Sequence, residues 1–154
     1  MPLDPQRIRQ YLREFRLGKL FNELGWDHCR EELTVTVDGQ AYGLHAVAQK
    51  RGVTAFQCDP DAAGRIPPYS IRKRIETQVA RSYALHLIVF ANRDGSDQVW
   101  QWVKREAGRG AIPREQRYTR GQTGELLAQR LQALLFTLEQ EENLSVLDVG
   151  IAMK

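Results

Sequence analysis

The chain contains little cysteine and no long apolar run among its 154 residues. Its two cysteines, Cys29 and Cys58, are too few for a disulfide framework, so we expect a protein of the reducing cytoplasm. No apolar stretch approaches the roughly 20 residues that a membrane-spanning helix requires. The first 15 residues are too highly charged for a secretory signal. Length and composition therefore predict one globular domain over residues 1–154.

The common catalytic motifs are also missing. No glycine-rich loop ends in Gly-Lys-Ser/Thr, which argues against a P-loop nucleotide site. No serine has the flanking glycines of a nucleophile elbow. The histidines and cysteines do not fall into paired ligand spacings, so a zinc site is not expected. We interpret His45 and His86 as ordinary residues of strands, and Cys58 as a small core residue.

Positive charge is unevenly distributed along the chain. The net charge of +3 combines a balance of zero over residues 1–60, +6 over residues 61–120 and −3 over residues 121–154. A basic middle between neutral and acidic segments favours a polyanionic partner more than the total charge does.

Apolar periodicity predicts both helices and strands. Helical spacing occurs in three segments: 5–24, 70–82 and 124–141. Strand character occurs in five segments: 33–37, 41–49, 53–58, 85–90 and 99–103. Asp38-Gly39 is a hairpin signal between the first two strands.

The order of these segments predicts an α+β fold with a mixed sheet. The nearly continuous apolar run 85–90 indicates a strand in the centre of that sheet, and the 99–103 strand is expected at its edge. Residues 60–68 are predicted to form a loop. The arginine-rich residues 104–121 have no clear period and are predicted to be irregular.

The order of a helix, three strands, a helix and a strand resembles the core of the PD-(D/E)xK nuclease superfamily, the restriction-endonuclease-like fold. In that family an Asp near the start of the second strand and a Glu-x-Lys on the third strand hold Mg²⁺ and orient the attacking water. Carboxylates suit this role because Mg²⁺ takes hard oxygen ligands. The resemblance implies Mg²⁺-dependent cleavage of DNA where the motif is intact.

The motif can be placed on this chain in two ways, and each lacks a residue. Asp38 with Ala48-Gln49-Lys50 has alanine in place of the glutamate. Gln57-Cys58-Asp59 has glutamine in place of the glutamate and lacks the lysine. Asp38, Lys50, Gln57 and Asp59 are thus the catalytic candidates of an active enzyme, with Asp59 as the candidate metal ligand. The alternative is that Asp38, Lys50 and Asp59 only begin or form turns.

A second resemblance extends over nearly the whole chain. It is to the N-terminal domain of large bacterial restriction–modification proteins in which an Eco57-type methylase follows in the same chain. The segments that carry it are Phe21–Asp27, Val47–Gly52, Phe56 with Cys58, Ile66-Pro67, His86–Phe90, Val99–Val103 and Leu131–Glu139. The resemblance implies that DNA is a partner, together with methyltransferase and specificity domains of a longer parent chain. The chain itself contains no methyltransferase signature.

Clustered basic residues are the candidate contacts to DNA. Phosphate neutralisation requires only grouped positive charge, whereas nothing here indicates recognition of particular bases. Trp100, Trp102 and Tyr118 lie near this segment and are candidates for stacking on unpaired bases. The alternative is a solvated loop with its tryptophans packed on the sheet. The candidate DNA-binding residues are Arg72, Lys73, Arg74, Lys104, Arg105, Arg109, Arg114, Arg117 and Arg120.

Three classes of function remain open from the sequence. The first is a nuclease-like domain with a degenerate site that binds DNA or docks on the methylase, which the missing glutamate favours. The second is an active Mg²⁺-dependent endonuclease. The third is a protein-interaction domain unrelated to DNA.

Overall fold

A computed structural model describes residues 5–14, 16–50, 52–106, 110–118, 132–133 and 136 of the chain. Of residues 103–118 it gives the strand pairing and not the side chains. The helices are α1 (Pro5–Arg13), α2 (Leu17–Glu23) and α3 (Tyr69–Ala80). The strands are β1 (Asp27–Val37), β2 (Gln40–Lys50), β3 (Val53–Cys58), β4 (His86–Ala91), β5 (Gln98–Glu106) and β6 (Gly110–Tyr118).

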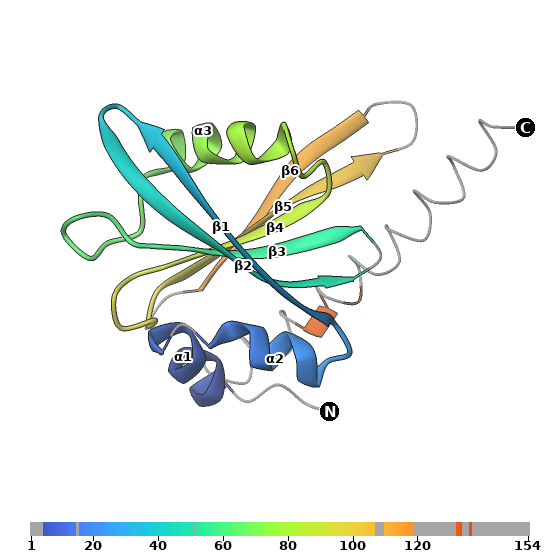
Figure 1. Ribbon diagram of the computed structural model, residues 1–154. Coiled ribbons are helices and arrows are strands. Elements are labelled where there is room, and N and C mark those ends of the chain that lie inside the picture. Colours follow the sequence, from blue (N-terminus) through green and yellow to red (C-terminus); the bar gives the residue numbers. More distant parts are fainter. Residues whose placement is uncertain are drawn as a thin grey trace, which may run out of the picture.

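The six strands form one mixed sheet in the order of the sequence. β1, β2 and β3 pair as an antiparallel meander, and β3 then pairs with β4 in parallel. Parallel neighbours require a crossover connection, and here the connection contains α3. β5 and β6 continue the sheet as antiparallel neighbours of β4. α1 and α2 lie on one side of the sheet and α3 on the other (Figure 1). The predicted α+β class with a mixed sheet is confirmed.

The turn between β1 and β2 has the geometry that its sequence predicts. Asp38 and Gly39 both have positive φ, 51° and 80°. Two consecutive positive φ values characterise the type I′ turn, whose twist matches that of paired strands. The turn sets a register in which Glu32 lies opposite His45.

Two apolar clusters hold the layers together. One lies under α1 and α2 and contains Phe21, Trp26 and Trp100. The other lies under α3 and contains Phe56, Ile75 and Phe90. All six residues of β4 are buried, because helices cover both of its faces. The expectation of a central strand here is therefore confirmed.

The predicted single helix 5–24 is wrong, because two helices occupy this range. Arg16 between them has φ −119° and ψ 25°, outside the helical region, and its amide bonds to the Tyr11 carbonyl at 2.8 Å. The break allows α2 to lie close against β2. A Cβ atom on Gly18 would stand only 2.8 Å from the Val47 carbonyl oxygen, so this approach requires glycine.

The prediction for the end of the sheet is also wrong. The strand expected at the edge, 99–103, is internal because β6 pairs along it. Residues 104–106 and 110–118, expected to be irregular, are strand residues. Their mostly polar sequence lacks the apolar alternation by which strands are recognised, although backbone pairing does not require it. The predicted helix 124–141 lies outside the described residues except at 132–133 and 136, which are helical.

None of the helices in the described ranges is long and apolar enough to cross a membrane.

Candidate functional site

A groove of about 1320 Å³ lies between α2 and the meander β1–β3. It forms because α1 and α2 cover only part of their face of the sheet. They pack on Ala48, Val53 and Ala55, at the end of the hairpin near the β2–β3 turn. His45 and Asp59, further along the same hairpin, line the groove and stay partly exposed.

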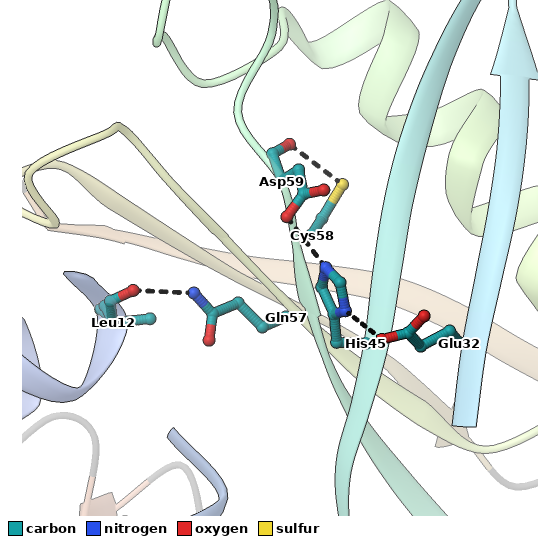
Figure 2. A network of polar contacts seen from close by, with 6 residues as sticks. All are labelled: Leu12, Glu32, His45, Gln57, Cys58 and Asp59. Atoms are coloured by element: carbon teal, nitrogen blue, oxygen red, sulfur yellow. Dashed lines mark hydrogen bonds and ion pairs between the residues drawn. The ribbon is translucent and has the colours of Figure 1, made fainter. Parts of the chain in front are cut away.

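Three polar side chains cross the floor of the groove in one row. Glu32 on β1 is paired with His45 on β2, which is paired with Gln57 on β3. Nδ1 of His45 lies 3.5 Å from Oε1 of Glu32, and Nε2 lies 3.0 Å from Oδ1 of Asp59. Figure 2 shows the imidazole ring between the two carboxylates. His45 is thus held in one orientation from both sides.

Asp59 is positioned by the backbone of β2. Its amide donates to the Gly43 carbonyl at 2.8 Å, which extends the β2–β3 ladder by one bond beyond Cys58. A Cβ atom on Gly43 would lie 2.5 Å from Oδ2 of Asp59. Glycine at position 43 therefore leaves the space that the carboxylate occupies.

Gln57 is buried and links the floor of the groove to α1. Its Nε2 donates to the carbonyl of Leu12 at 3.0 Å (Figure 2). Because a carbonyl group only accepts hydrogen bonds, this contact identifies the nitrogen and the oxygen of the Gln57 amide. Oε1 of Gln57 is buried without a partner among the described residues. Buried acceptors are usually satisfied, so this atom is an exception at the floor of the groove.

The four catalytic candidates are not gathered at one point. Asp38 lies in the β1–β2 turn and forms an ion pair with Arg74 at 2.7 Å. Lys50 lies at the opposite end of β2, paired with Val53. Val53 and Asp59 are six positions apart along extended chain, which is roughly 20 Å at about 3.3 Å per residue. The structure brings together only Gln57 and Asp59, and adds His45 to them.

These residues do not fit a nuclease magnesium site. Among the described residues there is no group of three or more His, Cys, Asp or Glu side chains that could hold a metal ion. Oδ1 of Asp59 is shared with His45, and Gln57 contributes no negative charge. Mg²⁺ sites in proteins use carboxylates together with water or phosphate, and the second carboxylate is missing here.

The candidate DNA contacts on α3 differ in exposure. Arg72 is buried, with 1% of its surface exposed. Its Nη1 donates to the Pro67 carbonyl at 2.8 Å, and its guanidinium lies over the ring of Phe90. Arg72 therefore cannot reach a DNA backbone from this position. Lys73 and Arg74 are exposed, and Arg74 is engaged by Asp38.

The remaining candidates lie on or beyond β5 and β6. Trp100 and Trp102 are buried in the core under α1 and α2, so they cannot stack on bases. Lys104, Arg105, Arg114 and Arg117 belong to strand positions whose side chains are not described. Arg109 and Arg120 lie outside the described residues, as does the side chain of Tyr118.

Two further titratable groups have structural roles. Burial raises the pKa of the Cys58 thiol, and the nearby Asp59 carboxylate acts in the same direction. Cys58 is a core residue, as expected. Burial lowers the pKa of His86, whose Nδ1 lies 2.8 Å from the Tyr83 carbonyl. His45 was also expected to be an ordinary strand residue, and no sequence signal indicated its place between Glu32 and Asp59.

No model of a known protein family, no curated protein and no solved structure matches the chain.

Proposed function

We propose that the chain is a DNA-handling, nuclease-like domain of a restriction–modification enzyme with a degenerate catalytic site. One observation carries the proposal. Gln57 on β3 and Asp59, which follows the last residue of β3, are two positions apart and line the groove beside His45 on β2. In the PD-(D/E)xK nucleases, the Glu-x-Lys pair and the Asp of the preceding strand have this relation to each other.

The topology supports the same proposal. Helices α1 and α2, the antiparallel meander β1–β3, the crossover through α3 and a parallel β4 follow in the order that the resemblance implies. The nuclease core needs this crossover because it places the third and fourth strands side by side and in parallel.

The donor set of the site favours binding over cleavage. Under the proposed correspondence, Gln57 and His45 take the places of the carboxylates that attract a divalent cation, and a neutral ligand attracts Mg²⁺ less than an anion does. The domain would then contact DNA or dock on methyltransferase and specificity domains of a longer parent chain, in the cytoplasm. We expect the DNA contact to be weak, independent of sequence and strongly dependent on salt.

Binding and cleavage assays on the full 154-residue chain test the proposal. We expect a labelled duplex to bind at about 50 mM salt and to dissociate at about 200 mM, because phosphate contacts release counterions. We expect no cutting of plasmid DNA with Mg²⁺ or Mn²⁺. Robust cutting that Asp59→Ala or Lys50→Ala abolishes would establish an active endonuclease instead. Absence of binding to any DNA would reject the DNA contact and leave docking on the methyltransferase and specificity domains as the role of the domain.

A further inference from the structure

The exposed side of α3 carries positive charge and no carboxylate. Lys73 and Arg74 lie there within the helix, and Arg81 is its C-cap residue; all three are exposed. The single acidic residue of α3, Glu76, is instead buried and accepts a hydrogen bond from Nε2 of Gln101 at 2.5 Å. Lys73 and Arg81 form no ion pair with the described part of the chain. These two cations are therefore available to an anionic partner.

The third cation, Arg74, is held by Asp38 in the β1–β2 turn. Nη1 of Arg74 lies 2.7 Å from Oδ1 of Asp38, and the two side chains are 55% and 67% exposed. An exposed ion pair of this kind contributes little to stability, so a phosphate can compete for the guanidinium. The planar guanidinium group also matches the geometry of a phosphate with two hydrogen bonds. Asp38 is therefore an internal competitor of an external anion at Arg74.

The shape of the same helix face suits a phosphate backbone. Ser70, Thr77 and Ala80 share the exposed side of the helix with the cations, and their side chains are short. Lys73 and Arg81 are eight positions apart, which is about 12 Å along a helix at about 1.5 Å per residue. Over that length one strand of B-DNA carries about three to four phosphates, at about 3.4 Å of axis each. The cations are thus spaced to contact several phosphates of one strand.

We infer that the exposed face of α3, with Lys73, Arg74 and Arg81, binds the phosphate backbone of duplex DNA. This inference rests on the proposed function and names the surface and the form of the DNA. Sites for single strands combine a groove with aromatic side chains on which successive bases stack. This face is instead the outer side of a helix, and its exposed aromatic residue is Tyr69 alone. A duplex, which offers phosphates and no unpaired bases, fits it better.

The α3 face lies on the other side of the sheet from the nuclease-like residues. α3 covers one side of the sheet, and α1 and α2 cover the other (Figure 1). Gln57 belongs to the second side, because it donates to the Leu12 carbonyl on α1. Asp59 lines the groove beside α2. A duplex bound on α3 would therefore place no phosphodiester at Gln57 or Asp59, as expected of a domain that binds DNA without cutting it.

Two matched variants test the assignment to α3. Lys73→Gln with Arg81→Gln removes two charges from α3. Arg13→Gln with Lys19→Gln removes two from the helices on the other side of the sheet. All four side chains are exposed and glutamine is a good helix former, so both proteins should fold, which circular dichroism and thermal melting verify. Fluorescence anisotropy of a labelled duplex of about 20 base pairs gives the affinities between about 50 and 200 mM salt.

We expect the α3 variant to bind the duplex about tenfold more weakly than the parent, and the control variant to lose less than about threefold. The slope of log K against log salt should become shallower by about 1.8 in the α3 variant, at about 0.9 per lost phosphate contact. The control variant should keep the slope of the parent.

A third variant tests the competition at Arg74, and its expected gain in affinity cannot come from a folding defect. Asn-Gly is a preferred pair for a type I′ turn, so Asp38→Asn keeps the turn between β1 and β2. The change releases Arg74, and we expect the affinity to rise about two- to fivefold, in line with the small net energy of an exposed ion pair. Asp27→Asn makes the same change of charge at the opposite end of β1 and should have less effect.

The inference is overturned, while the parent still binds DNA, if the two double variants lose affinity equally. It is also overturned if Asp38→Asn gives no gain, or no more than Asp27→Asn gives. Tighter binding of a single strand than of the duplex would have the same meaning. Polyglutamate that competes as well as unlabelled duplex at equal charge would identify an acidic protein as the partner instead. A parent that binds no DNA would reject the DNA contact of the proposed function itself.

Discussion

Nε2 of His45 lies 3.0 Å from Oδ1 of Asp59, across the pair of strands β2 and β3. The contact exists because Gly43 has no side chain: a Cβ atom there would stand 2.5 Å from the other carboxylate oxygen. Asp59 follows the last residue of β3, and its amide donates a hydrogen bond to the Gly43 carbonyl. This bond fixes the backbone from which the Asp59 side chain extends. The backbone thus holds both members of this polar contact in place.

A double-mutant cycle measures this contact. Because both side chains are about one-third exposed, we expect His45→Gln and Asp59→Asn to show a coupling of about 0.2–1 kcal/mol in the free energy of unfolding. Gly43→Ala should reduce the coupling, since the new methyl group displaces the carboxylate. Urea unfolding of the single and double variants gives the values. Strictly additive effects in the parent background would show that the pair does not interact in solution.

Gly18→Ala tests the close approach of α2 to β2. Helix propensity alone predicts a gain of about 0.8–1.0 kcal/mol for alanine in place of glycine. The new Cβ atom would lie 2.8 Å from the Val47 carbonyl oxygen, which is too close. We therefore expect the opposite effect, a decrease of about 1–3 kcal/mol in the free energy of unfolding from overpacking. Thermal or urea unfolding distinguishes the two, with Lys19→Ala as an exposed control in the same helix. A more stable Gly18→Ala protein would mean that α2 does not lie against Val47.

His86 should make stability depend on pH. Burial lowers its pKa in the folded protein, below the value of about 6.5 for an unfolded chain. Above about pH 6.5 the imidazole of His86 is neutral in both the folded and the unfolded protein. Its whole contribution to the free energy of unfolding is then present. As the pH falls below that value, the unfolded state binds a proton that the folded state does not, so the free energy of unfolding decreases.

Urea unfolding between about pH 7.5 and pH 5.5 measures this dependence. His86→Asn removes the titrating group and keeps a side-chain donor for the Tyr83 carbonyl. The difference between parent and variant isolates His86 from the other titrating groups, which both proteins share. The parent should lose more stability than the variant on acidification. Parallel curves for the two proteins would show that His86 has the same pKa folded and unfolded.

Arg72→Ala should lower stability and leave DNA affinity unchanged. The change removes the bond to Pro67 and the ring contacts with Tyr69 and Phe90. We expect a loss of about 2–4 kcal/mol in the free energy of unfolding, whereas Lys73→Ala next to it should stay within about 0.5 kcal/mol. Binding measured well below the melting temperature separates the two effects. A stable Arg72→Ala protein with weakened DNA binding would identify Arg72 as a surface contact after all.

Local signals in the sequence predicted much of the sheet. The Asp38-Gly39 pair specifies a turn that requires two positive φ values, and 53–58 is a strand with the predicted bounds. The run ending at Phe90 is apolar without alternation because both faces are covered, which is why its central position was predictable.

The features that sequence reasoning missed depend on tertiary contacts. The apolar spacing of Leu12 and Leu20 continues across the break at Arg16, so periodicity does not reveal two helices. β6 includes Pro113 and charged residues, and only its register with β5 identifies it. His45 and Asp59 meet because of a register shift between Ala46 and Ala48, which no local pattern specifies.

The order of the strands also has a consequence for how the chain folds. Each of the six described strands has an antiparallel neighbour that is also adjacent in the sequence, and such pairs close short loops. The parallel pairing of β3 with β4 is different, because it joins residues that are distant in the sequence: Thr54 and His86 are 32 positions apart. Pairings of distant residues slow folding because loop closure precedes any gain in contacts. We therefore expect the β1–β3 and β4–β6 units to form early, and the docking of β4 on β3 to limit the rate.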